Sequence, residues 1–212
     1  TMRLKNVKGA NEIIEKGTYF ISNPTNYKGN WASIFENNNP INIEIGMGKG
    51  DFIIENAIKY PNINFIGIEK FDSVIVRAIQ KSNELELKNL KLIRMDALNI
   101  DEVFAKEINT IYLNFSDPWP KARHEKRRLT SKIFLEKYSK IFKAKEHIIM
   151  KTDNIDLFNY SKESLESYGY HINFYTNDLY QNPKYLQDNI PTEYEKKFVK
   201  LGIKINKLDA TK

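Results

Sequence analysis

The sequence predicts a single α/β domain whose twisted sheet is mostly parallel, with helices on both faces and an antiparallel strand near the C-terminus. From residue 41 onward, short apolar runs alternate with segments whose apolar residues recur at helical spacing. This repeated strand–helix–strand order is typical of parallel sheets. A length of 212 residues and an apolar fraction of 41% fit one large domain with a packed core.

Five of the apolar runs are predicted strands. They are rich in Ile and apolar at consecutive positions, which is the pattern expected where helices cover both faces of a sheet. The predicted strands span residues 41–45, 65–68, 90–95, 110–115 and 147–151.

Three segments between these strands are predicted helices, because their apolar residues repeat at helical spacing. The three predicted helices lie within residues 52–60, 74–79 and 129–142. Short polar residues that accept hydrogen bonds from free helix amides are available before two of them. The candidate N-caps are Asp72 or Ser73 for the second helix and Thr130 or Ser131 for the third.

The N-terminal segment differs from the rest of the chain. It is polar and is interrupted by Pro24, Gly29 and Pro40, which break up regular elements. We therefore expect an N-terminal arm over residues 1–40 that leads into a domain over residues 41–212.

The last quarter of the chain predicts strands of another kind. Apolar and polar residues alternate over residues 170–176 and again over 198–205. Strict alternation is typical of half-buried strands. We therefore expect a terminal pair of the hairpin type, which makes the sheet mixed rather than fully parallel.

Composition narrows the possible functions. A net charge of +6 favours an anionic partner such as nucleic acid. The absence of Cys excludes disulfides, thiolate metal sites and a cysteine nucleophile, and three scattered His predict no metal site. Neither a secretion signal nor a run long enough to span a bilayer is present, so we expect a cytoplasmic protein. Monomer and homodimer both stay open.

A glycine-rich loop follows the first predicted strand. Gly46, Gly48 and Gly50 permit a tight turn and let a ligand approach bare backbone. A dinucleotide-binding loop would have Gly or Ala where Asp51 stands, and that carboxylate would repel a pyrophosphate. Glu44 followed by alternate glycines instead resembles motif I of the class I methyltransferases, whose fold is Rossmann-like. That resemblance implies S-adenosylmethionine, which carries no phosphate.

Two further acids stand at the ends of the next two predicted strands. Glu69 ends the second strand, where a carboxylate can accept hydrogen bonds from both ribose hydroxyls of a cofactor. Asp96 follows the third strand, where it can accept from an adenine amino group. Successive strand ends of a parallel sheet meet at one edge, so these side chains are candidates for one cofactor site.

The fourth predicted strand runs into Asp117-Pro118-Trp119-Pro120, a loop that two prolines stiffen. Together with the following residues through Leu129, this loop resembles the bacterial tRNA (guanine-N7)-methyltransferase family. The resemblance extends from Glu44 to the C-terminus, with further matches at 152–154 and 192–195. It implies methylation of N7 of the guanine at position 46, in the variable loop of tRNA.

The resemblance also implies roles for individual residues. Asp117 would be catalytic and would also contact the cofactor, together with the acids and glycines of the strand ends. The implied cofactor-binding residues are Glu44, Gly46, Gly48, Gly50, Glu69, Asp96 and Asp117. The implied substrate-binding residues are Lys121, Asp153, Thr192, Glu193, Tyr194 and Glu195. The implied RNA-binding residues are Arg123, His124, Lys126, Arg127 and Arg128.

The chemistry of the acceptor fixes what the protein must supply. N7 of guanine carries a free lone pair and no proton at neutral pH, so its attack on a methyl group needs no general base. The displacement moves positive charge onto the imidazole ring. Alignment and a negative group near that ring are therefore the useful contributions, and Asp117 is the candidate for the second.

Residues 121–128 hold five fixed positive charges, which predict contact with phosphates. A solvated basic loop is the alternative. Trp119 either stacks on a base or is buried. Arg3, Lys5 and Lys8 of the arm are weaker candidates for RNA contact.

Three other functions remain as alternatives. A methyltransferase could act on another nucleic-acid or protein acceptor, although the Asp-Pro-Trp-Pro loop disfavours amine acceptors. A catalytically silent RNA-binding module disagrees with the intact acids, and a dehydrogenase disagrees with Asp51.

Overall fold

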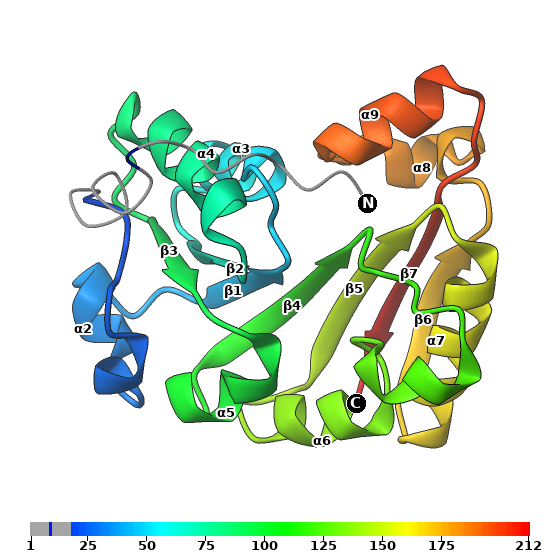
Figure 1. Cartoon of the computed structure of the whole chain (residues 1–212), viewed down its shortest axis with the longest axis horizontal. Helices are drawn as coiled ribbons and strands as arrows, with labels where there is room; N and C mark the ends of the chain where they lie inside the picture. The colour runs from blue at the N-terminus through cyan, green and yellow to red at the C-terminus, as the bar shows by residue number, and fades with distance from the viewer. Residues whose placement is uncertain (1–8, 10–17) are drawn as a thin grey trace.

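The structure is a computed structural model that describes residue 9 and residues 18–212 (Figure 1). Within that part, one seven-stranded sheet has the order β3-β2-β1-β4-β5-β7-β6. The strands are β1 (Ile41–Ile45), β2 (Asn64–Glu69), β3 (Leu90–Arg94), β4 (Ile108–Asn114), β5 (His147–Thr152), β6 (His171–Thr176) and β7 (Asn206–Thr211). The first five pair in parallel, whereas β7 is antiparallel to β5 and to β6. The five predicted strands and the mixed sheet are confirmed.

Helices cover both faces of the sheet (Figure 1). The longer ones are α3 (Asp51–Lys59), α4 (Asp72–Asn83), α6 (Lys132–Ser139), α7 (Ile155–Ser167) and α9 (Glu193–Lys200). The shorter ones are α2 (Trp31–Phe35), α5 (Ile100–Val103) and α8 (Pro183–Leu186), with 3-10 turns η1 (Pro24–Tyr27), η2 (Ala97–Asn99), η3 (Ala122–Arg127) and η4 (Leu179–Gln181). The three predicted helices correspond to α3, α4 and α6.

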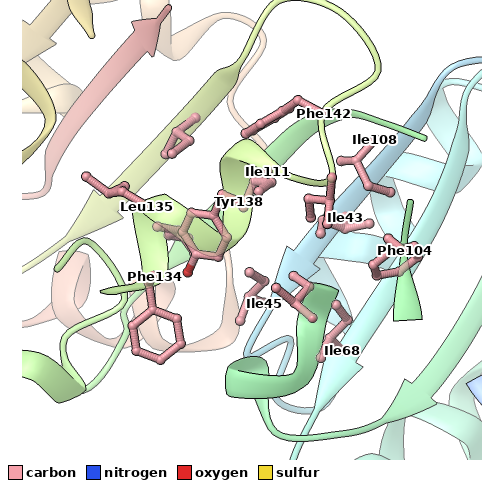
Figure 2. Close-up of a cluster of buried hydrophobic side chains, with 14 of the residues drawn as sticks. Ile43, Ile45, Ile68, Phe104, Ile108, Ile111, Phe134, Leu135, Tyr138 and Phe142 are labelled. Atoms are coloured by element: carbon pink, nitrogen blue, oxygen red, sulfur yellow. The ribbon is translucent and has the colours of Figure 1, made fainter. Parts of the chain in front are cut away.

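Two buried clusters hold the layers together. On one face, Ile43 and Ile45 of β1 pack with Ile111 of β4 and with Leu135 and Tyr138 of α6 (Figure 2). The second cluster joins α3 and α4 to β2 and β3. Since a strand alternates its faces, the even positions of β1 lie on the α3 side. Both clusters are almost wholly aliphatic or aromatic, as the Ile-rich runs predict.

The described part of the predicted N-terminal arm packs against the domain. Trp31 of α2 is fully buried, donates a hydrogen bond from its indole nitrogen to the Val103 carbonyl at 2.9 Å, and packs on Phe104. Phe20 forms an isolated parallel bridge with Leu92. The suggested contacts of the arm with RNA fall on residues outside the described part, namely Arg3, Lys5 and Lys8.

The prediction of a strand over 198–205 is wrong. Residues 193–200 form α9, and the strand that pairs with β6 is β7, at 206–211. The connection from β6 to β7 passes through η4, α8 and α9, so the terminal pair is antiparallel without being a hairpin. The cause is local: a Thr192 cap starts a helix here, and the residue that buries deepest is the charged Glu195, which no hydrophobic pattern reveals.

The sheet has a switch point between β1 and β4. From this pair the parallel strands run outward in chain order, through β2 and β3 on one side and to β5 on the other. Ligands of such sheets bind at the carboxyl ends of the strands beside the switch. In Figure 1, α8 and α9 lie at that end, beyond the tips of β4 and β5. In the described residues, none of the helices is long and apolar enough to cross a membrane.

Candidate active site

The glycine loop lies at the carboxyl end of β1. Gly46, Gly48 and Gly50 have φ values of 76°, 59° and 85°, a left-handed conformation that other residues rarely adopt. A Cβ atom on Gly50 would also lie 2.9 Å from the Cβ of Ala78 in α4. The loop therefore turns into α3 with its backbone bare, as the glycine spacing predicts.

Glu69 fastens this loop to the end of β2. Its two carboxylate oxygens accept hydrogen bonds from the backbone amides of Gly48 at 3.0 Å, Lys70 at 2.8 Å and Phe71 at 3.1 Å. Burial raises the pKa of Glu69 above its ordinary value, the three amides oppose this, and the charge of Asp117 adds to the rise. The Phe71 amide is also where α4 begins, so Phe71 is its N-cap rather than Asp72 or Ser73.

Glu44 and Asn114 form a buried polar pair across β1 and β4. The Asn114 side-chain amide donates to Glu44 Oε2 at 2.8 Å. Burial raises the pKa of Glu44 to about 8, although Asn114 and Lys151 act to lower it. Glu44 Oε1 and Asn114 Oδ1 have no hydrogen-bond partner among the described residues. Two unsatisfied buried oxygens side by side can accept from a cation or an N–H donor. The sequence reasoning missed Asn114.

Asp96 lies at the rim of the same end of the sheet, after β3. It accepts from the Leu98 amide at 3.0 Å and pairs with the Lys70 ammonium at 2.7 Å. Partial burial acts to raise its pKa, but Lys70 and the amide hold the pKa of Asp96 below its ordinary value. It is therefore an ionised acceptor, and Lys70 joins it to the turn that Glu69 holds.

The loop after β4 has strained backbone on both sides of Asp117. Phe115 and Trp119 have φ values of 52° and 46°, in the left-handed region, at a cost of about 1–2 kcal/mol each. Hydrogen bonds hold both residues: the Phe115 amide donates to the Lys151 carbonyl at 2.8 Å, and the Trp119 carbonyl accepts two from Arg128, at 3.0 and 3.1 Å. Asp117 itself is exposed at the turn.

Arg128 has an intramolecular role that the sequence did not indicate. Besides binding the Trp119 carbonyl, its guanidinium lies 4.4 Å from the ring centroid of Tyr160 on α7. The Tyr160 hydroxyl in turn donates to Glu125. Arg128 is half-buried in these contacts and anchors the Asp117 loop to α7.

Most of the other basic residues in 121–127 are exposed to solvent. Two of the residues in this range also contact Trp119. Trp119 is half-buried, with the His124 ring edge-on at 5.6 Å and the Arg127 guanidinium 4.9 Å from its ring centroid. The exposed members are Lys121, Arg123, Lys126 and Arg127. Trp119 is thus neither fully buried nor fully free to stack on a base, because its ring is partly covered by its own loop.

Residues 192–195 start α9. Thr192 caps the helix by accepting from the Glu195 amide at 3.0 Å, Glu193 pairs with Lys49 of the glycine loop at 3.2 Å, and Tyr194 is 59% exposed. Phe198 lies against Phe115, with ring centroids 5.8 Å apart. These contacts place α9 across the switch point, between the glycine loop and the Asp117 loop.

Glu195 is committed to a buried ion pair. Its Oε1 lies 2.8 Å from the Lys151 ammonium at the end of β5, and both side chains are at most 3% exposed. Lys151 also donates to the Ile190 carbonyl and to Asn189, while Glu195 Oε2 accepts from Tyr180 and Asn189. Burial lowers the pKa of Lys151, and Glu195 opposes the fall. The sequence reasoning read Lys151 only as the end of a strand and missed this network.

A cavity of 170 Å³ lies beside this network, between α3, the sheet and residues 188–190; Phe52, Tyr112, Asn114 and Lys151 are among its lining residues. Asp153 is half-buried in the turn from β5 to α7, two residues beyond Lys151. Among the described residues, no group of three or more His, Cys, Asp or Glu could hold a metal ion.

The structure thus brings most predicted site residues to one end of the sheet. The glycine loop, Glu44, Glu69, Asp117 and the start of α9 surround the switch point, and Asp96 joins them through Lys70. The η3 segment follows the Asp117 loop and is held to Tyr160 of α7 through Glu125 and the adjoining Arg128.

Comparison with known proteins adds family evidence. A family model described as "Putative methyltransferase" matches residues 38–208. A tRNA (guanine-N(7)-)-methyltransferase of Lachnoclostridium phytofermentans is 49% identical over 210 residues, covering 99% of this chain and 98% of that protein. The protein of the same name from Bacillus subtilis is 48% identical over 203 residues, covering 95% of this chain and 94% of that protein.

Two solved structures share the fold. The 16S rRNA methyltransferase KamB superposes with a TM-score of 0.64 at 10% identity, over 86% of this chain and 92% of that one. An antibiotic-related methyltransferase gives 0.60 at 20% identity, over 87% and 92%. At these identities the likeness supports the Rossmann-like methyltransferase fold and nothing more specific.

Proposed function

The chain belongs to the family of tRNA (guanine-N(7)-)-methyltransferases, and from this premise we propose that it methylates N7 of the guanine at position 46, in the variable loop of tRNA, with S-adenosylmethionine as the methyl donor. One structural observation carries the site assignment. Glu69 holds the bare glycine loop at the β1–β4 switch point, and α9 joins that loop to the Asp117 loop through the Lys49–Glu193 ion pair and the Phe115–Phe198 contact. Under this proposal, a donor held by Glu69 and an acceptor that faces Asp117 meet at this end of the sheet.

The residues present fit S-adenosylmethionine. The glycine loop offers backbone without side chains, and Glu69 Oε2 accepts only one hydrogen bond from the described residues, so it can accept another from a ribose hydroxyl. Asp96 is an ionised acceptor at the position expected for the adenine amino group. Glu44 Oε1 and Asn114 Oδ1 are unsatisfied and suit the ammonium group of the methionine part.

The proposed mechanism is a direct displacement. When bound, S-adenosylmethionine supplies a methyl group on a cationic sulfur. Asp117 places a carboxylate beside the purine ring, which gains positive charge as N7 bonds to the methyl group, and the rigid backbone around Asp117 keeps this charge in place without reorganisation. No group needs to remove a proton, because N7 has none.

The guanine contacts also belong to the proposal. Asp153 lies at the end of β5 and can accept from the ring N–H and the amino group of guanine. The remaining proposed substrate-binding residues are Lys121, Thr192, Glu193, Tyr194 and Glu195. The position of α9 supports this for Tyr194, which is exposed beside Phe198, the residue that packs on Phe115. Glu195 acts indirectly in this scheme, because its carboxylate is engaged by Lys151.

Incubation with labelled methyl donor and tRNA lacking modifications tests the proposal. The label is expected in one 7-methylguanosine at position 46 after nuclease mapping. Label at an exocyclic amine, or on protein, would support the alternative acceptors instead. A tRNA with adenine at that position is the matched control and should stay unlabelled.

The exposed basic residues of η3 are predicted to bind phosphates. Replacing Arg123 and Lys126 together by Gln should make the slope of log Kd for tRNA against log salt shallower by about 1.4–1.8, since each lost phosphate contact removes about 0.7–0.9. Arg128 is unsuitable for this test because it holds the Trp119 carbonyl. Filter binding at several salt concentrations measures the slope.

Lys143 and Lys145 provide the matched control for that experiment. Both are exposed and precede β5, at the end of the sheet opposite the crevice. Their double replacement by Gln removes the same charge and should leave the slope unchanged. Equal slopes for both variants and the unmodified chain would mean that η3 is a solvated surface.

The proposal also extends to the location and the oligomeric state of the protein. A cytoplasmic location follows from the tRNA substrate of the bacterial relatives. The proposed reaction is compatible with a monomer and with a homodimer.

A further inference from the structure

The buried residues of α9 determine which of its side chains face solvent. Glu195 is wholly buried against Lys151, and Phe198 packs on Phe115. In a helix of 3.6 residues per turn, residues 196, 197 and 200 then project away from the buried side. Lys196, Lys197 and Lys200 are indeed exposed. The ion pair therefore orients three ammonium groups toward solvent at the rim of the crevice.

Within the described ranges of the chain, the acids of α9 pair with only one lysine of this face, Lys197. Glu195 is committed to Lys151, and Glu193 is shared by Lys49 and Lys197, at 3.2 and 3.6 Å. In the described part of the chain, the recorded ion pairs include neither Lys196 nor Lys200. These two lysines are four residues apart on one helix face, where like charges repel by a few tenths of a kcal/mol. Holding these two positive charges close together therefore does not stabilise α9 itself.

The crevice beside this face is acidic. Glu69, Asp117 and Asp153 lie at or just after the strand ends, whereas Asp51 at the start of α3 is paired with Lys81. A polyanionic substrate must bring one base into this acidic region while its phosphates stay outside it. Cations at the rim favour that geometry, because attraction to phosphate falls off within about 10 Å at moderate salt.

An exposed aromatic side chain accompanies the lysines. Tyr194 stacks on Phe198, with centroids 6.4 Å apart, and the Lys197 ammonium lies 5.6 Å from the Tyr194 ring. Basic residues with an exposed ring are the usual composition of single-stranded nucleic-acid surfaces. We propose that Lys196, Lys197 and Lys200 form a second phosphate-binding surface for the substrate RNA, separate from η3. This inference rests on the proposed function.

The test uses the full chain and unmodified tRNA. Lys196 and Lys200 are replaced together by Gln, and Lys197 is retained because it pairs with Glu193. The salt slope of tRNA binding should become shallower by about 1.4–1.8. The KM for tRNA should rise. The kcat at saturating tRNA and the affinity for S-adenosylmethionine should stay unchanged, because among the described residues neither lysine side chain forms a hydrogen bond or ion pair with the site.

The Lys143 and Lys145 double replacement is again the control for equal loss of charge. A slope for the α9 variant equal to that of the control would overturn the inference, even though the unmodified chain still methylates guanine. Failure of the proposed function is a separate result, since the unmodified chain would then leave tRNA unlabelled at N7. A combined variant of α9 and η3 should lose both contributions additively if the two surfaces are independent.

Discussion

Replacing Asp117 by Ala is expected to lower kcat by about 10²–10³-fold, the usual effect of removing one preorganised charged or hydrogen-bonding group from a transition state. Asp117 is the carboxylate nearest to where the purine gains positive charge in the proposed displacement. It is exposed, and in the described part of the chain no hydrogen bond or ion pair holds its side chain. The fold should therefore change little, within about 0.5 kcal/mol for a surface substitution.

Single-turnover methylation at saturating tRNA and methyl donor measures this effect. Asp117→Asn separates charge from shape and should be nearly as slow as Asp117→Ala. Glu166→Ala is the matched control, since Glu166 is an exposed acid near the end of α7, away from the crevice. A variant without Asp117 that turns over at the normal rate would remove this residue from the catalytic role.

Breaking the Lys151–Glu195 pair is expected to lower the stability of the protein more than any of the other proposed substitutions. Lys151→Met leaves the Glu195 carboxylate buried without its cation, and Glu195→Leu leaves the Lys151 ammonium buried without its anion. Each change should lower the free energy of unfolding by about 3–5 kcal/mol. The double variant should recover a large part of this loss, because two apolar side chains can fill the space that the charges held. Recovery stays incomplete, since the Ile190 carbonyl and the Tyr180 hydroxyl lose their partners, at about 1–3 kcal/mol per buried group.

Urea unfolding of the four chains of this double-mutant cycle gives the coupling energy. The exposed pair Lys132–Glu136, with 79% and 53% exposed side chains, is the control, and Lys132→Met should change stability by less than about 0.5 kcal/mol. Simple addition of the two buried replacements would contradict the assignment. Since α9 carries the proposed substrate residues, the single variants should also lose activity before they unfold.

The fold was largely predictable because its information is local. The apolar runs of the five parallel strands and the glycines with positive φ each follow from a few neighbouring residues. The position of Glu69 and Asp117 at one edge of the sheet was also predictable, since the carboxyl ends of parallel strands share that edge.

What the sequence could not show depends on contacts between distant residues. Glu195 lies in a polar stretch and looks solvated, and only the Lys151 ammonium, 44 positions away in the chain, makes its burial possible. The wrong prediction of a strand over 198–205 has a local cause instead, since Thr192 caps a helix just before these residues. Arg128 looked like part of a charge run, yet its role depends on the positive φ of Trp119 and on Tyr160.

The buried Glu44 carboxyl couples the fold to pH. Its pKa rises from 4.5 to about 8 on folding because of burial, so between these values the folded chain keeps a proton that the unfolded chain has lost. The stability of the ligand-free protein therefore falls as pH rises across this interval. A cation lodged against Glu44 Oε1 favours the ionised form and releases that proton. The methyl donor should consequently protect the protein against heat more strongly at the alkaline end of the interval than at the acidic end.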